Sequence, residues 1–183
     1  MLANTYRRRL KTFADNQYGF VTTRDALQLG IPAVELRKLA SRGGLEQVWR
    51  SVYRFSDVPH TANDRFMKAV LCVGPDAYLV GESVLALHEL AMVNPRAIQV
   101  SAPRRCRAKL PSSVKFVAIN HVGDTVTSYE GIPSMSVSQA LYFCRGAVMG
   151  SRLNEAIDVA AQRGLLHRAE IKRLRAKLHD SVA

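Results

Sequence analysis

The stretch PAVELRKLASRGGLEQVWRSVYRF, residues 32–55, decides the fold of the N-terminal part of this chain. Its first half places Leu36 and Leu39 on one side of a helix, and Gly43-Gly44 ends that helix. Its second half predicts two short apolar strands that meet at Arg50-Ser51, the tip of a hairpin. Because a hairpin tip is exposed, cations placed there are often present for a partner.

Shorter elements precede this stretch. An apolar repeat predicts an amphipathic helix over residues 5–15, and a brief strand follows over residues 19–21. Thr22 and Asp25 have the spacing of a capping box, which predicts a short helix over residues 24–29. The resulting order of helix, strand, helix, tight turn, helix and hairpin is that of a winged helix-turn-helix.

A polar, proline-containing stretch, SDVPHTAND (residues 56–64), predicts a domain boundary. We expect a winged helix-turn-helix over residues 1–56 and a larger mixed α/β domain with a helical C-terminus over residues 57–183, an α+β chain overall. Gly131-Ile132-Pro133 is expected to lead into a turn. The other elements predicted in the second domain are helices at 65–73, 82–90, 137–144, 152–162 and 169–178 and strands at 97–102, 113–119 and 124–129.

The charge of the chain favours a polyanionic partner. The sequence has 26 Lys and Arg against 15 Asp and Glu, with a formal net charge of +11. Residues 1–56 carry ten of these cations and only four acids. Nucleic acid is the leading candidate for such a surface, and an anionic membrane surface is second. The apolar runs are far too short to span a bilayer, and the N-terminus lacks the apolar core of a signal peptide.

The helix over residues 32–42 would enter the major groove with the face opposite its leucines. Arg37 and Lys38 suit guanine edges or phosphates, and an exposed Val34 suits a thymine methyl. Arg50 at the hairpin tip suits a phosphate or an A·T-rich minor groove, while Trp49 and Tyr53 are expected to pack the wing onto the helices. A solvated basic face used for protein contacts is the plainer alternative. The candidate contacts of this helix are Val34, Arg37, Lys38, Ser41 and Arg42.

The sequence holds no clear motif of enzyme chemistry. Glu170-Ile171-Lys172 has the E-x-K spelling of metal-dependent nucleases, but the leucines around it set a helical period instead of a strand. His88-Glu89 lacks a second histidine at a metal-binding interval, and Ser83 lacks a glycine-flanked nucleophile turn. Three scattered cysteines suit a reducing cytosol and buried thiols. We predict no catalytic residue, no metal and no cofactor.

The sequence resembles the AbiEi-type antitoxins of type IV toxin–antitoxin and abortive-infection systems. The specific part is Gly19 to Phe55, with GFVTTRDALQLGIP, LRKLASRGGLEQV and the RSVYRF ending. Looser similarity continues through GESVLALHEL, AIQVSAP and EGIPSMSVSQAL. At the wing the family commonly reads Arg-Gly-Val-Tyr, and Ser51 takes the place of that glycine. Since serine adopts a left-handed turn only at a cost, we expect a different turn conformation here.

The resemblance implies a protein with two roles. Its winged helix would bind inverted repeats in its own promoter and repress a toxin–antitoxin operon. Its C-terminal domain would counter a nucleotidyltransferase-like toxin, directly or indirectly. The family positions that carry over as DNA contacts are Thr23, Arg24, the outer face of the second helix of the pair, and Arg50.

A basic loop in the second domain adds a further candidate surface. It would extend the DNA footprint or contact the toxin or its RNA target, and a merely solvated loop explains the pattern equally well. Its cations are Arg104, Arg105, Arg107 and Lys109.

We therefore expect a cytoplasmic DNA-binding antitoxin and transcriptional repressor with no membrane partner. No heptad run marks a dimerisation helix, so a monomer or weak dimer is expected. The alternatives are a DNA-processing enzyme with a nuclease-like C-terminal domain and a stand-alone transcription factor whose C-terminal domain binds a small ligand.

Overall fold

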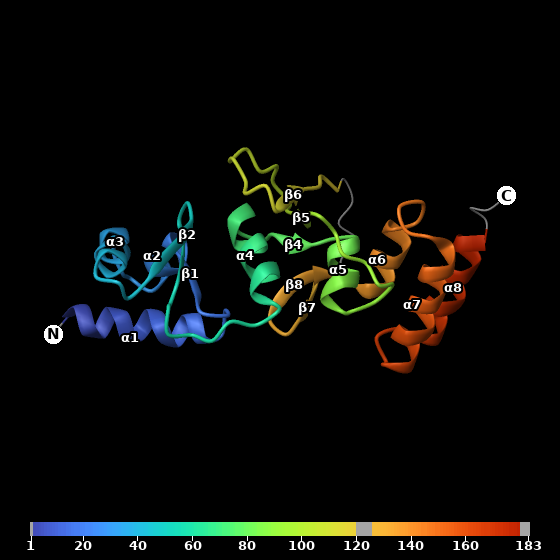
Figure 1. Cartoon of the computed structure of the whole chain (residues 1–183), viewed down its shortest axis with the longest axis horizontal. Coiled ribbons are helices and arrows are strands. Elements are labelled where there is room, and N and C mark those ends of the chain that lie inside the picture. Colours follow the sequence, from blue (N-terminus) through green and yellow to red (C-terminus); the bar gives the residue numbers. More distant parts are fainter. Residues whose placement is uncertain (1, 120–125, 180–183) are drawn as a thin grey trace.

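The computed structural model describes residues 2–119 and 126–179. The molecule is elongated, with α1 (Leu2–Asp15) near one end and α8 (Arg168–His179) at the other (Figure 1). A small helical unit with a three-stranded sheet comes first, a five-stranded sheet lies in the middle, and a group of helices closes the far end. The chain is thus an α+β protein with a helical C-terminal region, as predicted.

The N-terminal unit is a winged helix-turn-helix. After α1 come β1 (Phe20–Thr22), α2 (Thr23–Gln28), α3 (Ala33–Ser41), β2 (Glu46–Trp49) and β3 (Val52–Arg54). Strand β3 lies between β1 and β2 in an antiparallel sheet. The predicted capping box is present, since the Asp25 N–H donates to Thr22 Oγ1 at 3.1 Å and the Thr22 N–H donates to Asp25 Oδ2 at 2.8 Å.

The second unit is built on a mixed sheet of five strands in the order β6, β5, β4, β8, β7. Helices α4 and α5 contact strand β5 of this sheet. Its elements are α4 (Asp64–Val73), β4 (Tyr78–Leu79), α5 (Glu82–Leu87), β5 (Ile98–Ser101), β6 (Val114–Phe116), β7 (Val126–Tyr129) and β8 (Ile132–Met135). The remaining helices, α6 (Val137–Phe143), α7 (Gly150–Gln162) and α8, pack on one another.

Two strands differ from the sequence prediction. Strand β4 is only two residues long and was not predicted. Gly131-Ile132-Pro133 was expected to lead into a turn, but Ile132–Met135 form β8, which pairs with both β4 and β7. Pro133 is tolerated there because β4 is bridged to β8 at Ser134, so the proline does not have to supply an N–H to that bridge. Residues 124 and 125 of another predicted strand lie outside the described residues.

The two units share apolar and polar contacts. Phe20 and Val52 of the winged helix belong to the larger core, together with the buried residues of α4 and the five-stranded sheet. The Tyr18 hydroxyl donates a hydrogen bond of 2.8 Å to the carbonyl oxygen of Glu130, in the turn between β7 and β8. The boundary predicted between residues 56 and 57 stays a prediction, because contacts such as these cross it.

Candidate nucleic-acid interface

Helix α3 has two different faces. Leu36 and Leu39 are buried in the smaller core, which belongs to the N-terminal unit, whereas the opposite face is exposed. Val34 is notable there because it is apolar and still 44% exposed. The exposed residues on and just after this helix include all five of its predicted DNA contacts: Val34, Arg37, Lys38, Ser41 and Arg42. The predicted division of the helix is confirmed, and contact with DNA stays a prediction.

The cations of α3 are not equivalent. Lys38 Nζ lies 2.8 Å from Glu35 Oε1, one helical turn away. Arg37 and Arg42 take part in none of the ion pairs formed by residues 2–119 and 126–179. A duplex would therefore meet Arg37 and Arg42 without a carboxylate partner, while Lys38 would exchange a carboxylate for a phosphate.

The start of α2 is joined to the tip of the wing. The Thr23 N–H donates a hydrogen bond of 3.0 Å to the carbonyl oxygen of Ser51. Thr23 is half-buried at this junction, whereas Arg24 and Arg50 are exposed on either side of it. The hydrogen bond fixes the two predicted contact regions relative to each other.

The wing turn does not have the conformation that we expected from its sequence. Ser51 has φ 62°, so it adopts the left-handed conformation that glycine tolerates best, and the expectation that serine would avoid it is wrong. Tyr53 is buried in the smaller core, as predicted. Trp49 instead packs, half-buried, against the larger core, so the wing rests on the second unit as well as on its own helices.

A cleft of about 520 Å³ brings together cations that are far apart in the sequence. Arg24 and Arg50 line it from the N-terminal unit, and Lys109 lines it from the loop between β5 and β6. Asp25 and Asp76 also line the cleft, but the Asp25 carboxylate is occupied by the capping box. Three exposed cations from three segments thus surround one opening, which sequence spacing alone did not predict.

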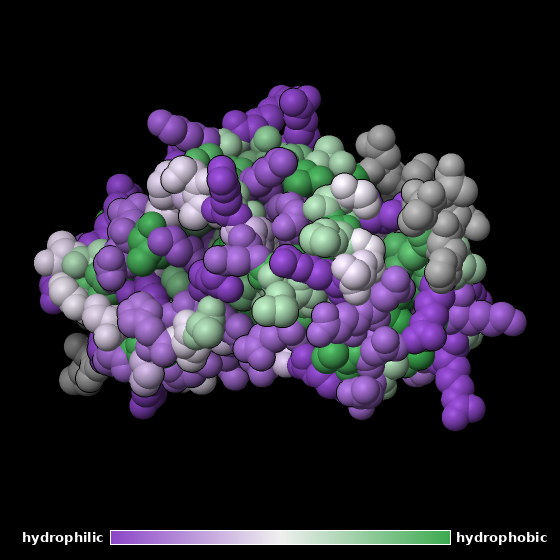
Figure 2. Space-filling model, turned by 45° about the vertical axis from the view of Figure 1, so that its right-hand side comes forward, coloured by the Kyte–Doolittle hydropathy of each residue, from purple (hydrophilic) through white to green (hydrophobic). Residues whose placement is uncertain are grey.

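The rest of the basic loop is open to solvent. The loop joins β5 to β6 and extends to the same side of the molecule as the tip of the wing (Figure 1). Hydrophilic side chains project from this upper edge (Figure 2). The three further cations of the loop, Arg104, Arg105 and Arg107, are all exposed.

The comparison with protein families agrees with this geometry. Residues 8–56 match the family model described as "Transcriptional regulator, AbiEi antitoxin". The match runs from α1 to just beyond β3, and so covers the whole helix-turn-helix and its wing. No curated protein matches the chain. The N-terminal region therefore matches a transcriptional regulator domain of the AbiEi antitoxin type, and we call residues 8–56 the AbiEi region.

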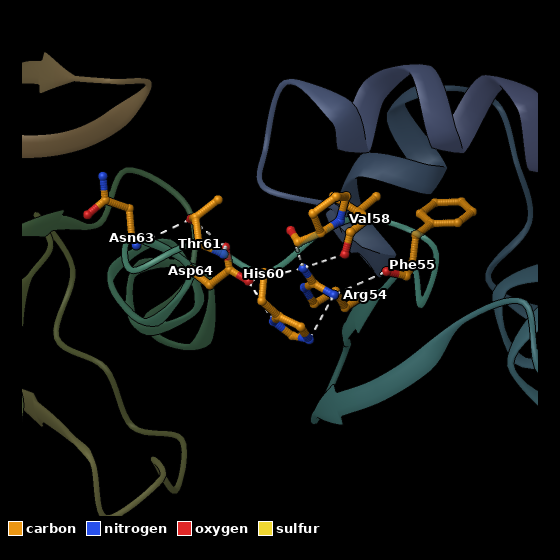
Figure 3. A network of polar contacts seen from close by, with 8 residues as sticks. Arg54, Phe55, Val58, His60, Thr61, Asn63 and Asp64 are labelled. Carbon is orange, nitrogen blue, oxygen red and sulfur yellow. Dashed lines mark hydrogen bonds and ion pairs between the residues drawn. The ribbon is translucent and has the colours of Figure 1, made fainter.

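Arg54, the last residue of the AbiEi wing strand β3, is buried and does not belong to the exposed surface. Its guanidinium is enclosed by the segment that leads into α4 (Figure 3). It lies 3.3 Å from His60 Nε2 and donates to Asp64 Oδ2 at 3.0 Å. It also donates to the carbonyl oxygens of Phe55, Val58 and Pro59 at 3.3, 2.9 and 3.0 Å.

Asp64 is the acidic centre of this network. Burial alone would raise the pKa of its carboxyl, but hydrogen bonds from Thr61 and His60 and the charge of Arg54 outweigh burial and lower that pKa. The carboxylate is consequently kept ionised beside the guanidinium. The predicted polar connection is thus a folded segment that holds the AbiEi region to α4.

The cations of α1 also have structural partners. Arg7 and Lys11 both lie within 6 Å of the Phe55 ring centroid and near Asp57. Arg9 donates a hydrogen bond of 2.6 Å to the carbonyl oxygen of Leu29. These cations stabilise the AbiEi region from the side of α1, and we do not include them in the candidate interface.

The residues considered for enzyme chemistry occupy structural positions. Glu170 and Lys172 lie on α8, as the helical period predicted, and Glu170 accepts the backbone N–H of His167 at 2.8 Å. Ser83 is buried and accepts the Gln99 N–H at 2.7 Å. Within the described parts of the chain, no three His, Cys, Asp or Glu residues could hold a metal ion together. Nor does any described helix have the length and apolar character needed to cross a bilayer.

Burial explains the low reactivity of two of the three cysteine thiols. Cys72 and Cys144 are buried, and burial raises the pKa of Cys72 to about 11 and that of Cys144 to about 12. Both are therefore inert thiols packed in the larger core, as predicted. Cys106 differs, because it is only half-buried in the basic loop.

Proposed function

We propose that this chain is a DNA-binding antitoxin that represses its own operon in the cytoplasm and counters a nucleotidyltransferase-like toxin. One observation carries the DNA-binding part. The start of α2, the tip of the wing and the basic loop line a single cleft with exposed cations. The predicted reading face of α3, which is not part of the lining of this cleft, is also exposed. The family match at residues 8–56 supports the regulatory role.

In this proposal α3 enters the major groove of the operator. Arg37 reaches a guanine edge, Val34 meets a thymine methyl, and Lys38 leaves Glu35 for the DNA. Ser41 and Arg42, at the end of the helix, contact the adjacent backbone. The exposure of these side chains supports this arrangement.

The cleft holds the phosphate backbone beside that groove. Arg24 and Arg50 approach the duplex from the winged helix, and Lys109 approaches from the second unit. Thr23 positions the start of α2 through its hydrogen bond to the wing turn. The remaining loop cations, Arg104, Arg105 and Arg107, would extend the same footprint. An operator with inverted repeats would take one copy of the chain on each half-site, as monomers or a weak dimer.

A DNA-binding assay tests this part. Fluorescence anisotropy is measured with duplex from upstream of the gene and with a scrambled duplex, over a range of salt. We expect Arg37→Ala to relax the sequence preference, because a good base contact is worth roughly 1–3 kcal/mol. Arg50→Ala should weaken binding to both duplexes by the same factor. Arg152→Ala, which removes an exposed cation from α7 in the C-terminal helical region, is the control. Unchanged binding in both Arg37→Ala and Arg50→Ala would remove the assignment.

The part of the chain after the winged helix would carry the antitoxin role, by direct binding or indirectly. Co-expression of the full chain with the neighbouring toxin gene tests this role through rescue of growth. A chain with Arg104, Arg105 and Arg107 each changed to Glu separates the possibilities for the basic loop. If this variant no longer rescues growth but still binds DNA, the loop contacts the toxin. If it rescues growth but no longer binds DNA, the loop contacts DNA. If both activities persist, the loop has neither role.

A further inference from the structure

A second cavity borders the C-terminal end of α4. Its volume is about 640 Å³, within the range of roughly 300–1,000 Å³ that is usual for small-molecule sites. Its lining is mostly apolar, with Met67, Val70 and Leu71 on α4 and Val126 on β7. Three prolines, Pro75, Pro103 and Pro133, complete much of the wall.

Few polar groups face this cavity, and they are chemically distinct. Gln17 contributes an amide and Asp76 a carboxylate. Both side-chain hydrogen bonds of Gln17 use its amide nitrogen, which donates to the Phe20 carbonyl and to Asp25 Oδ2, each at 3.3 Å. The amide oxygen makes no hydrogen bond with the described residues and is available as an acceptor for a ligand. A neutral, mainly apolar molecule with a hydrogen-bond donor fits this lining.

The cavity shares a wall with the cationic cleft. Residues Leu71, Gly74, Pro75 and Asp76, at and just after the end of α4, line both openings. Gly74 and Asp76 both have positive φ, at 129° and 58°, so this turn follows an unusual backbone path. A molecule in the cavity would press on the segment that also borders the cleft of Arg24, Arg50 and Lys109.

A second connection leads from the cavity to the helix-turn-helix. Gln17 lines the cavity and donates to the Asp25 carboxylate, which also accepts the Thr22 N–H in the capping box of α2. An occupant that binds the Gln17 amide thus contacts a residue bonded directly to the start of α2. The cavity is connected to the DNA-facing elements through both α4 and α2.

We propose that this cavity binds a small, neutral, largely apolar molecule and that its occupation changes the affinity of the winged helix for DNA. The coupling rests on the proposed DNA-binding function, whereas the site itself does not. The ligand would act through the shared wall and the Gln17 amide, by favouring one arrangement of the turn after α4 over another.

Fluorescence of N-phenyl-1-naphthylamine, a neutral apolar probe, tests the site without DNA. We expect saturable one-to-one binding to the full chain. Val126 lines the cavity and is 48% exposed, so the fold tolerates a charge there. Val126→Lys and Val126→Asp should each raise the Kd of the probe by about tenfold or more, because a charge beside an apolar ligand must be desolvated. Absence of saturable binding, or binding unaltered by both changes, overturns the site.

Met149 provides the matched control, since it is apolar, 66% exposed and not among the residues that line the cavity. Met149→Lys and Met149→Asp should leave probe binding unchanged, and an equal loss in these variants would overturn the assignment to the cavity. Melting temperatures close to that of the parent chain show that the variants fold.

Operator binding measured with and without the probe tests the coupling. We expect the probe to shift the operator Kd of the parent chain but not that of either Val126 variant. The use of both charge signs separates a ligand effect from a direct effect of charge on DNA binding. Probe binding with no shift in operator Kd overturns the coupling. A chain that binds no operator in either condition refutes the proposed function, while the fluorescence titration still decides the site.

Discussion

Arg54 on the wing strand and Asp64 on α4 form a buried ion pair, with Nη2 and Oδ2 3.0 Å apart. Arg54 is only 3% exposed, although it lies in a hairpin whose other cation, Arg50, is at the surface. Two cations of one hairpin therefore differ in their surroundings: Arg50 is exposed to solvent, whereas Arg54 attaches the hairpin to the rest of the molecule.

Removing the acid of this pair should destabilise the whole chain. Asp64→Ala leaves a buried guanidinium without its countercharge, and we expect a loss of about 3–5 kcal/mol in the free energy of unfolding, measured with urea. Asp158→Ala breaks an exposed ion pair with Arg175 and should cost less than about 1 kcal/mol. Similar small losses in both variants would show that the Arg54–Asp64 pair does not hold the units together.

Lys109 should contribute to DNA affinity from outside the helix-turn-helix. If Arg50 and Lys109 each neutralise one phosphate, Lys109→Ala should weaken binding to all duplexes alike. It should also lower the slope of log K against log salt by about 0.9. The Arg50→Ala, Lys109→Ala double variant should lower the slope by about twice that amount. Lys115→Ala, which removes an exposed cation from β6, should leave the slope unchanged. A slope unaffected by Lys109→Ala would restrict the footprint to the winged helix.

The left-handed Ser51 predicts a stabilising substitution. Ser51→Gly relieves the clash of a side chain at φ 62° and keeps the main-chain hydrogen bond to Thr23. Allowing for the extra freedom of glycine in the unfolded chain, we expect a gain of about 0.5–1 kcal/mol in unfolding free energy. Ser51→Ala retains the Cβ atom and should bring no such gain. Equal stability of the glycine and alanine variants would contradict the backbone explanation.

His88 should make the protein sensitive to acid. Burial, assisted by the charge of Arg163 and partly opposed by Glu130, lowers the pKa of this imidazole from 6.5 to about 4. Between these values the unfolded chain takes up a proton that the folded chain excludes. The contribution of neutral His88 to the free energy of unfolding is thus intact above pH 6.5. It is lost as the pH falls toward 4, by up to roughly 3 kcal/mol.

His88→Phe isolates this effect. The phenyl ring can keep the packing against Tyr129, whose ring centroid lies 4.1 Å from that of His88, and it has no proton to bind. Urea unfolding above and below the pH window should show a smaller acid loss in the variant than in the parent chain. Parallel pH profiles for the two proteins would show that His88 is not the group responsible.

Much of the fold was predictable because its signals are local. The period of apolar residues and the Thr22–Asp25 capping box determine the helices of the N-terminal unit from their own sequence. Strand β4 gave no such signal, since two residues cannot display an alternating pattern. Residues 132–135 contain a proline that usually ends strands, and only the neighbouring strands β4 and β7 make a strand there possible.

The sequence predicted which residues belong to the candidate interface. It did not predict which of them lie close together in space. Helical spacing placed Arg37 and Lys38 on the exposed face of α3, which the structure confirms. That Lys109 lines the same cleft as Arg24 and Arg50 depends on how the two units pack, and no local pattern reports that packing. The burial of Arg54 was missed for the same reason, although Asp64 ten residues later offered a hint of a partner.

Phe20 and Val52 give the winged helix a place in the larger core, and this limits how freely the protein can be recombined. A chimera that joins the winged helix to an unrelated effector domain would expose both side chains. It would also leave the Arg54 guanidinium without the Asp64 carboxylate. A functional chimera would have to include the matching surface of α4. The segment that can be transferred intact is therefore longer than the winged helix alone.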